Sequence, residues 1–99
     1  MVEENAVIEK VIAYLKKRVD ISDIFLFGSI TTGNFTEDSD IDIALYIKNY
    51  ETYSLKDFAR ILFHIQDQFS SRIELHFFPD KAEPLTFPDY IRNTGKKVA

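Results

Sequence analysis

Apolar side chains recur along the chain with two periods, and the longer of these predicts helices. Between residues 5 and 18 the apolar positions fall three or four residues apart, which is the spacing of one helix face. The same spacing returns over residues 55–69, with charged residues between the apolar ones. A shorter helix is predicted over residues 88–93, capped by Gly95 in a conformation with positive φ.

Three strands are predicted, two from apolar side chains at every second residue and one from an unbroken apolar run. Residues 23–27 form an apolar run of strand length, which favours a central strand covered on both faces. Residues 40–47 alternate between apolar and other side chains, which places one face in the core and the other in water. Residues 72–78 alternate in the same way. The predicted inward positions of these two strands are Ile41, Ile43, Leu45, Ile47, Ile73, Leu75 and Phe77.

The order of these elements predicts an α/β (α+β) fold. We expect a small mixed β-sheet of three to four strands, with the two long helices on one face. The acidic positions of the strands then mark the uncovered face. A length of 99 residues without a repeat or linker favours a single domain over residues 1–99.

Composition excludes several classes of protein. The chain has no cysteine, which excludes a disulfide scaffold and a thiolate metal site. Its net charge of −4 argues against direct binding of a nucleic-acid backbone. No apolar run approaches the ~20 residues of a membrane span, and the first residues lack the apolar core of a signal peptide. We therefore expect a soluble, cytoplasmic domain.

Four acidic residues stand within six positions around the start of the second strand: Glu37, Asp38, Asp40 and Asp42. Asp40 and Asp42 occupy alternate strand positions, so their carboxylates project from one face, roughly 6–7 Å apart. Two carboxylates so close repel each other unless a cation lies between them. A solvated strand face is the alternative interpretation of an isolated pair.

Glu74 on the third strand also points away from the predicted core. If the two strands are neighbours, Asp40, Asp42 and Glu74 converge into a cluster of three carboxylates. Such oxygen ligands suit Mg²⁺ or Mn²⁺ rather than Zn²⁺. Two such ions about 3.5–4 Å apart would activate a hydroxyl and stabilise a leaving pyrophosphate.

A turn suited to phosphate follows the first strand. Unpaired backbone N–H groups at Gly28 and Ser29, with the Ser29 hydroxyl, form a phosphate seat if a short helix opens there. Gly28 lets a phosphate approach the backbone, and Gly33 permits the turn back to the acidic strand. A GxxxxGK[ST] phosphate loop is excluded because Asn34 and Phe35 follow Gly33. A phosphate seat beside a metal cluster implies a nucleoside triphosphate.

Taken together, Gly28-Ser29, Asp40-x-Asp42 and one later strand carboxylate resemble the polymerase-beta-like nucleotidyltransferase superfamily. The length and the segment from Pro88 to Val98 resemble its single-domain branch, the minimal nucleotidyltransferases, which are commonly paired with a HEPN-domain toxin. The resemblance implies a metal-dependent transferase and antitoxin. It would move a nucleoside monophosphate, AMP from ATP, to a tyrosine hydroxyl of the partner toxin and release pyrophosphate.

The resemblance also implies a role for each site residue. Gly28 and Ser29 would hold the β- and γ-phosphates of ATP, Asp40 and Asp42 would bind both metal ions, and Glu74 would complete the ion that activates the acceptor. The sequence departs from the family pattern at two places. Glu74 replaces the usual Asp, and the turn before Gly33 is Ile-Thr-Thr without the basic residue that many members carry. Both departures concern the catalytic rate rather than the fold.

Several alternatives stay open. The chain could be a weak or inactive subunit that binds and masks a partner protein, or a globular domain without a nucleotide. A homodimer is an alternative to the HEPN partner. Tyr46 is a candidate to stack a base or line the acceptor site. His76 is a candidate to orient the substrate or to support a site residue from behind, or it has no role. The basic residues Arg92, Lys96 and Lys97 form either a charged surface or a contact to triphosphate or partner.

Overall fold

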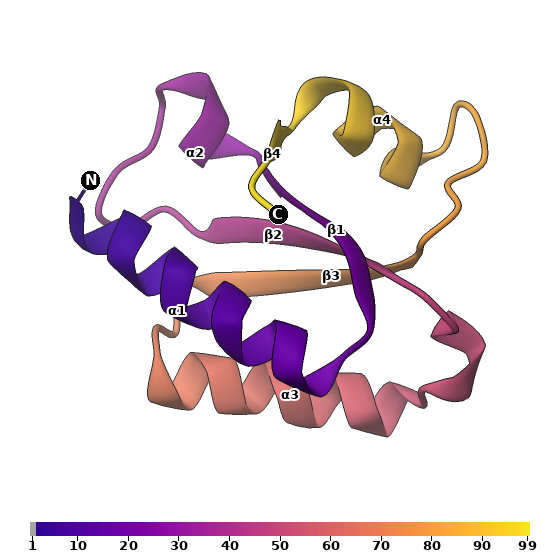
Figure 1. The fold of residues 1–99 in the computed structure, drawn as a ribbon. Helices are drawn as coiled ribbons and strands as arrows, with labels where there is room; N and C mark the ends of the chain where they lie inside the picture. The colour runs from indigo at the N-terminus through magenta and orange to yellow at the C-terminus, as the bar shows by residue number, and fades with distance from the viewer. Residues whose placement is uncertain (1) are drawn as a thin grey trace.

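A computed structural model describes residues 2–99, with side chains placed from Asn5 onward. Its elements follow each other in the predicted order (Figure 1). They are helix α1 (Val2–Arg18), strand β1 (Ile21–Phe27), helix α2 (Ser29–Thr32), strand β2 (Ile41–Ile47), the 3₁₀-helix η1 (Tyr50–Thr52), helix α3 (Leu55–Gln68), strand β3 (Ile73–Pro79), helix α4 (Phe87–Thr94) and strand β4 (Lys96–Lys97).

The strands form one mixed sheet in the order β3-β2-β1-β4. β1 pairs antiparallel with both β2 and β4, while β2 and β3 run parallel. A parallel pair needs a crossover connection, which α3 supplies between β2 and β3. The predicted α/β sheet is therefore confirmed, with β4 as an edge strand of two residues that the sequence pattern did not show.

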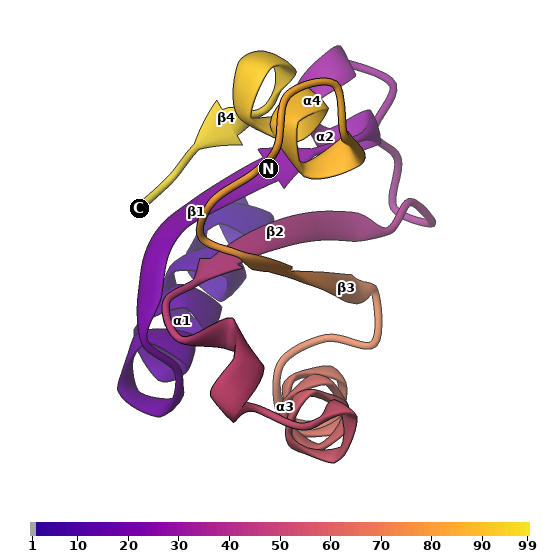
Figure 2. The ribbon, with the colours of Figure 1, turned by 90° about the vertical axis from the view of Figure 1, so that its right-hand side faces the viewer.

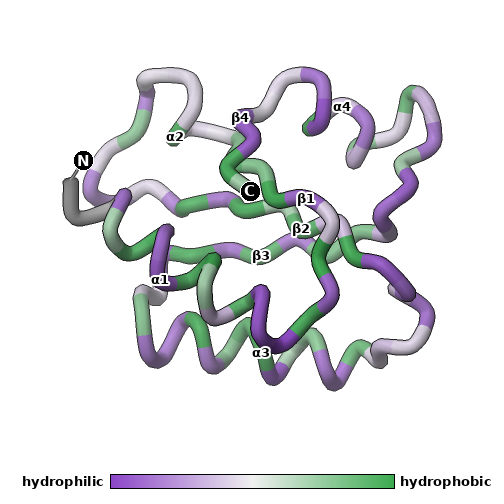
Figure 3. Tube along the Cα trace, viewed as in Figure 1, coloured by the Kyte–Doolittle hydropathy of each residue, from purple (hydrophilic) through white to green (hydrophobic). Residues whose placement is uncertain are grey.

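The two long helices cover one face of the sheet, as predicted (Figures 1 and 2). Val11 and Leu15 of α1 and Ile65 of α3 are fully buried against the strands. Figure 3 shows hydrophobic residues along the strands and at intervals along both helices. α3 starts at a capping box, in which Ser54 and Asp57 each accept a hydrogen bond from the other's backbone N–H.

The opposite face is covered over part of its area, and here the expectation of a water-facing surface is wrong. Ile91 of α4 is fully buried against Phe25, Ala44 and Tyr46, all of which are buried. The sequence of α4 fits this contact, because Ile91 follows Phe87 by four residues and so lies on the same side of the helix. The second face therefore stays open only beyond the area that α4 covers.

Tyr46 anchors α4 and does not face a ligand. It has no exposed surface, and its hydroxyl donates a hydrogen bond to the Pro88 carbonyl oxygen at 2.6 Å. The guanidinium group of Arg92 lies 4.0 Å above the centre of its ring. Burial raises the pKa of Tyr46 above its usual value, although the charge of Arg92 lowers it. The idea that Tyr46 stacks a base is therefore wrong, since the ring is enclosed.

Gly95 also differs from its prediction. Its φ of −80° and ψ of 174° are extended, so no positive φ is needed. A Cβ there would lie 2.7 Å from the Ile91 carbonyl oxygen and 2.8 Å from that of Leu26. Glycine is required because two backbone segments meet at this point, which is what brings β4 to the edge of β1.

The basic C-terminal residues divide between an internal contact and solvent. Arg92 and Lys97 form ion pairs with Asp23 on β1, at 2.9 Å and 3.1 Å. Burial would raise the pKa of Asp23, but hydrogen bonds from Lys97 and Arg92 outweigh it and hold that pKa below its usual value. Lys96 is exposed. Arg92 and Lys97 thus fasten α4 and β4 to β1.

No helix in the described part of the chain is long and apolar enough to cross a membrane.

Candidate active site

The turn between β1 and α2 has the conformation that its glycines allow. Gly28 has a φ of 79° and a ψ of −150°, a region that is almost restricted to glycine. Gly33 ends α2 in the left-handed region with a φ of 81°. The carbonyl oxygen of Gly28 accepts hydrogen bonds from the backbone N–H and the hydroxyl of Thr31. In the described chain the Ser29 hydroxyl has no hydrogen-bond partner, so it is available to a ligand.

Asp42 lies directly beside this turn. The antiparallel register of β1 and β2 pairs Phe27 with Asp42, which brings the carboxylate next to Gly28. A Cβ on Gly28 would lie 2.6 Å from Asp42 Oδ2, too close for any side chain. Glycine is therefore required at position 28 for its dihedral angles and for the space that the carboxylate occupies. The proposed phosphate seat and the first carboxylate share one corner of the sheet.

Glu74 stands beside Asp42 on the neighbouring strand. β2 and β3 are adjacent, and Asp42 pairs with Glu74 in their parallel register. Paired residues of adjacent strands point to the same face, so both carboxyl groups are on the face that faces away from α1 and α3. Glu74 is half-buried, and within the described residues its carboxylate has no hydrogen bond or ion pair. The strand arrangement on which its predicted role depends is therefore present.

Asp40 is exposed and precedes β2 by one residue. Its loop is held by a residue that the sequence pattern did not reveal. Arg72, just before β3, donates hydrogen bonds to the carbonyl oxygens of Ser39 at 2.9 Å and Thr36 at 3.1 Å. Its guanidinium group also lies 5.0 Å from the centre of the Phe35 ring. Arg72 therefore fixes the backbone before Glu37 and directly before Asp40, which positions Asp40.

His76 contacts the site through Asp42. Its Nε2 lies 3.2 Å from Asp42 Oδ1, and both side chains are partly buried. The Phe27 ring packs edge-on to the imidazole at 4.8 Å between ring centres. Phe87 of α4 contacts Phe27 at 5.8 Å in turn. The imidazole therefore orients one oxygen of Asp42, while the other faces the Gly28 turn.

The donor set can be tested against the metal that the sequence suggests. Three carboxylates and no sulfur ligand suit a hard divalent cation such as Mg²⁺. Gly28 also leaves room at Asp42 Oδ2, where a side chain would intrude. Among the side chains that the structure describes, however, no three acidic or histidine groups converge closely enough to hold an ion. Asp42 and Glu74 therefore fit the cation in chemistry and share one face of the sheet. The predicted convergence of Asp40, Asp42 and Glu74 into one cluster is wrong, because the three carboxylates are not gathered around one point.

Comparisons with known proteins agree with this arrangement. The sequence profile of the family "Polymerase beta, Nucleotidyltransferase" matches residues 9–99. Among solved structures, the chain is similar to the crystal structure of a candidate nucleotidyltransferase from Sulfolobus solfataricus. The TM-score is 0.53 and the identity 15%, over 97% of this chain and 74% of that one, which shows a shared fold. No protein in the curated set matches. Because the family profile covers nearly the whole chain, the protein belongs to the polymerase beta nucleotidyltransferase family.

Proposed function

We propose that this chain transfers AMP from ATP to a tyrosine hydroxyl of a HEPN-domain partner protein and thereby acts as its antitoxin. Family membership supports the general role of nucleotidyl transfer. The observation that carries the proposal is the corner where Gly28 makes room for Asp42 while Asp42 pairs with Glu74. The turn that would bind phosphate and the carboxylates that would bind a cation then lie at the same edge of the sheet. A nucleoside triphosphate needs both.

In the proposed reaction the acceptor oxygen forms a bond to the α-phosphorus of ATP. The bond between the α-phosphorus and the leaving pyrophosphate breaks, and the proton of the acceptor hydroxyl leaves to solvent. Gly28 and Ser29 hold the terminal phosphates through backbone N–H groups and the free Ser29 hydroxyl. Gly33 ends the turn so that the chain returns to Asp40.

Asp40, Asp42 and Glu74 would hold Mg²⁺ or Mn²⁺. When bound, the metal supplies charge neutralisation of the triphosphate and a lower pKa of the acceptor hydroxyl. The chain's own contribution is to place the ligands: Arg72 fixes the loop that carries Asp40, and His76 orients Asp42. The third carboxylate, Glu74, is unpaired within the described residues and free to turn toward the acceptor side.

A protein acceptor is supported by the surface around α4. Phe87, whose ring contacts Phe27 next to Asp42, is 53% exposed. Leu85, just before α4, is 99% exposed, and Tyr90, within α4, is 63% exposed. Exposed apolar side chains beside a site favour contact with a partner protein over contact with a small polar acceptor.

Intact-mass measurement of every chain tests the proposal. The protein is incubated with labelled ATP and Mg²⁺, with and without the protein encoded by its genomic neighbour as the candidate HEPN-domain partner. We expect one adenylate mass on the neighbour's chain, and we expect Asp40→Ala to abolish it. Unmodified chains in the presence of a stable complex would contradict the transferase proposal.

The second candidate is a subunit that neutralises its partner by masking a surface. It is favoured by the contact of His76 with Asp42 and by the carboxylates that do not gather around one point. Neutralisation of the partner by the Asp42→Asn variant discriminates between the two. Full neutralisation favours masking, and its loss, with the complex intact, favours transfer.

A further inference from the structure

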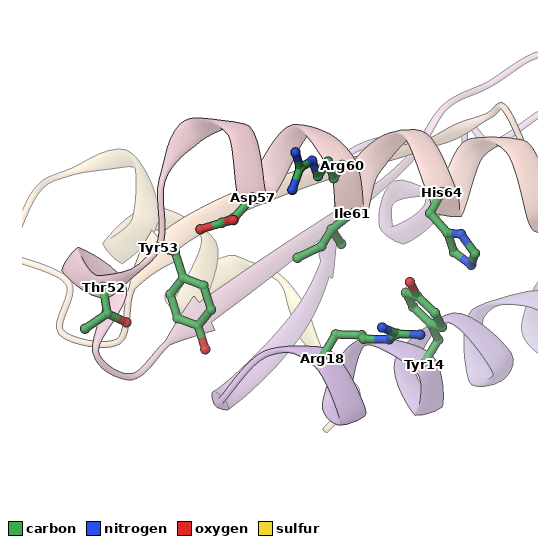
Figure 4. A pocket seen from close by; sticks show the side chains of 8 residues that line it. All are labelled: Tyr14, Arg18, Thr52, Tyr53, Asp57, Arg60, Ile61 and His64. Atoms are coloured by element: carbon green, nitrogen blue, oxygen red, sulfur yellow. The ribbon is translucent and has the colours of Figure 1, made fainter.

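A groove lies between α1 and α3, on the face of the sheet opposite to Asp42. Its volume is about 600 Å³. Figure 4 shows Tyr14 and Arg18 rising from α1 and Ile61 and His64 descending from α3, with Asp57 and Arg60 beside α3 and the loop before α3 closing one end. The lining residues are Tyr14, Arg18, Thr52, Tyr53, Asp57, Arg60, Ile61 and His64. The proposed transfer reaction uses none of them.

Two cations of the groove, Arg18 and Arg60, make no direct contact with an anion among the described residues, although the charge of Arg60 acts on Asp57. Arg18 lies 5.1 Å from the centre of the Tyr14 ring, which holds its guanidinium group over the groove. The one carboxylate present, Asp57, already accepts the backbone N–H of Ser54 at 2.8 Å. This hydrogen bond keeps the pKa of Asp57 below its usual value, with a smaller contribution from Arg60.

The hydroxyl groups of the groove add donors. Tyr53 Oη accepts the backbone N–H of Asp20 at 3.2 Å, so its own proton remains for another acceptor. Tyr14 Oη has no hydrogen-bond partner in the described chain. The Tyr14 ring is fixed by stacking on His64, with ring centres 4.6 Å apart. Two guanidinium groups and two phenol protons thus border a groove in which Asp57, the one carboxylate among the described lining residues, is engaged.

This local excess of donors and positive charge runs against the chain as a whole, whose net charge is −4. A donor-rich groove selects a ligand that is rich in acceptors and negatively charged. Guanidinium groups match phosphate best, because their planar fork donates two parallel hydrogen bonds to it. The volume falls within the roughly 300–1,000 Å³ that sites for small molecules have.

We propose that the groove between α1 and α3 binds a small phosphorylated ligand of nucleotide size, with Arg18 and Arg60 on its phosphate. The site is separate from the Gly28–Asp42 corner and needs no metal, since its donors carry the charge themselves. The proposal therefore stands or falls independently of the proposed transfer reaction.

Isothermal titration in the presence of EDTA tests it, with AMP, adenosine and inorganic phosphate as probes. We expect AMP to bind saturably, phosphate to compete with it, and adenosine to bind at least about tenfold more weakly, since charge-assisted hydrogen bonds carry the affinity. The double variant R18Q/R60Q should weaken AMP by about tenfold or more. The matched control K17Q/K56Q removes the same charge from exposed positions outside the groove and should leave the affinity unchanged.

Two further readouts keep the test decisive. In an NMR titration with AMP in EDTA, the backbone amide signals around Arg18 and Arg60 should shift while those of Gly28 and Ser29 stay in place, which puts the ligand outside the transfer site. Arg18 and Arg60 are exposed, so R18Q/R60Q should melt at an unchanged temperature. Equal binding of adenosine and AMP, equal loss in the two double variants, or no saturable binding at millimolar AMP would each overturn the proposal.

Discussion

The two faces of the sheet are built differently, although the same strands supply both. Toward α1 and α3 every side chain that β2 presents, from Ile41 to Ile47, is at most 2% exposed. Toward α4 the same strand presents Tyr46 and Ala44, which are fully buried, and then Asp42, which is not. One face is covered along its whole length, and the other is covered only as far as α4 reaches.

This difference shows where the chain can place polar chemistry. A carboxylate on the α1–α3 face would be enclosed by apolar side chains and would cost several kcal/mol to keep charged. At the open end of the other face Asp42 and Glu74 stay partly in water while their backbones remain fixed by the sheet. The first face stabilises the fold, and the second holds the carboxylates of the candidate site on a rigid support.

The largest effect is expected on the fully covered face. Leu15→Ala removes a side chain with no exposed surface and should lower the free energy of unfolding by about 2–5 kcal/mol. Urea denaturation measures this loss. Ala13 on the exposed side of the same helix supplies the control, since Ala13→Gly removes no buried surface and costs only about 1 kcal/mol of helix propensity. Equal losses in the two variants would contradict the assignment of the core.

Two glycine variants, Gly28→Ala and Gly33→Ala, test whether the Gly28 turn and Asp42 form one site at the open end of the second face. Both glycines have positive φ, so each substitution strains the backbone, by about 1–3 kcal/mol at Gly28. Only at Gly28 does the new Cβ meet the Asp42 carboxylate, because nothing lies within 4 Å of a Cβ at Gly33. We expect Gly28→Ala to weaken Mg²⁺-dependent ATP binding by tenfold or more, measured by titration, and Gly33→Ala to weaken it less. The reverse order would break the link between the turn and Asp42.

Tyr46→Phe tests the part of the second face that α4 covers. The variant keeps the ring and removes only the hydrogen bond to the Pro88 carbonyl oxygen. It should lower the free energy of unfolding by about 1 kcal/mol. Transfer activity per folded molecule should stay unchanged, since Tyr46 is enclosed. A loss of transfer activity without a loss of stability would show that Tyr46 does belong to the site.

The smallest effect concerns acid stability and compares two carboxylates from opposite sides of the sheet. The pKa values of Asp23 and Asp57 are lowered below 3.8 in the folded chain, so each stabilises the fold while ionised. That stability is present above the unfolded value of 3.8 and is lost as the pH falls through the lower folded value. In Asp23→Asn and Asp57→Asn the decline of melting temperature below this pH should therefore be shallower. An unchanged slope in both would contradict these contacts.

Local pattern predicted much of this structure. The helical and strand periods indicated the elements in order, and alternation placed Asp42 and Glu74 away from the main core. That α4 covers part of the second face could not be predicted, because it depends on the path of the loop between β3 and α4. Arg72 was missed for the same reason: its partners are backbone carbonyl oxygens more than thirty residues away, which leave no trace in the sequence.

The central claim is that the open end of the second face carries nucleotidyl transfer, and Asp42 tests it most directly. The measurement is the rate of adenylate transfer to the proposed HEPN-domain partner by Asp42→Asn and by Asp38→Asn, an exposed acid of the same run. We predict a loss of more than about 100-fold for Asp42→Asn, with an unchanged melting temperature, and a rate near that of the unmodified protein for Asp38→Asn. Equal rates in the two variants would contradict the claim.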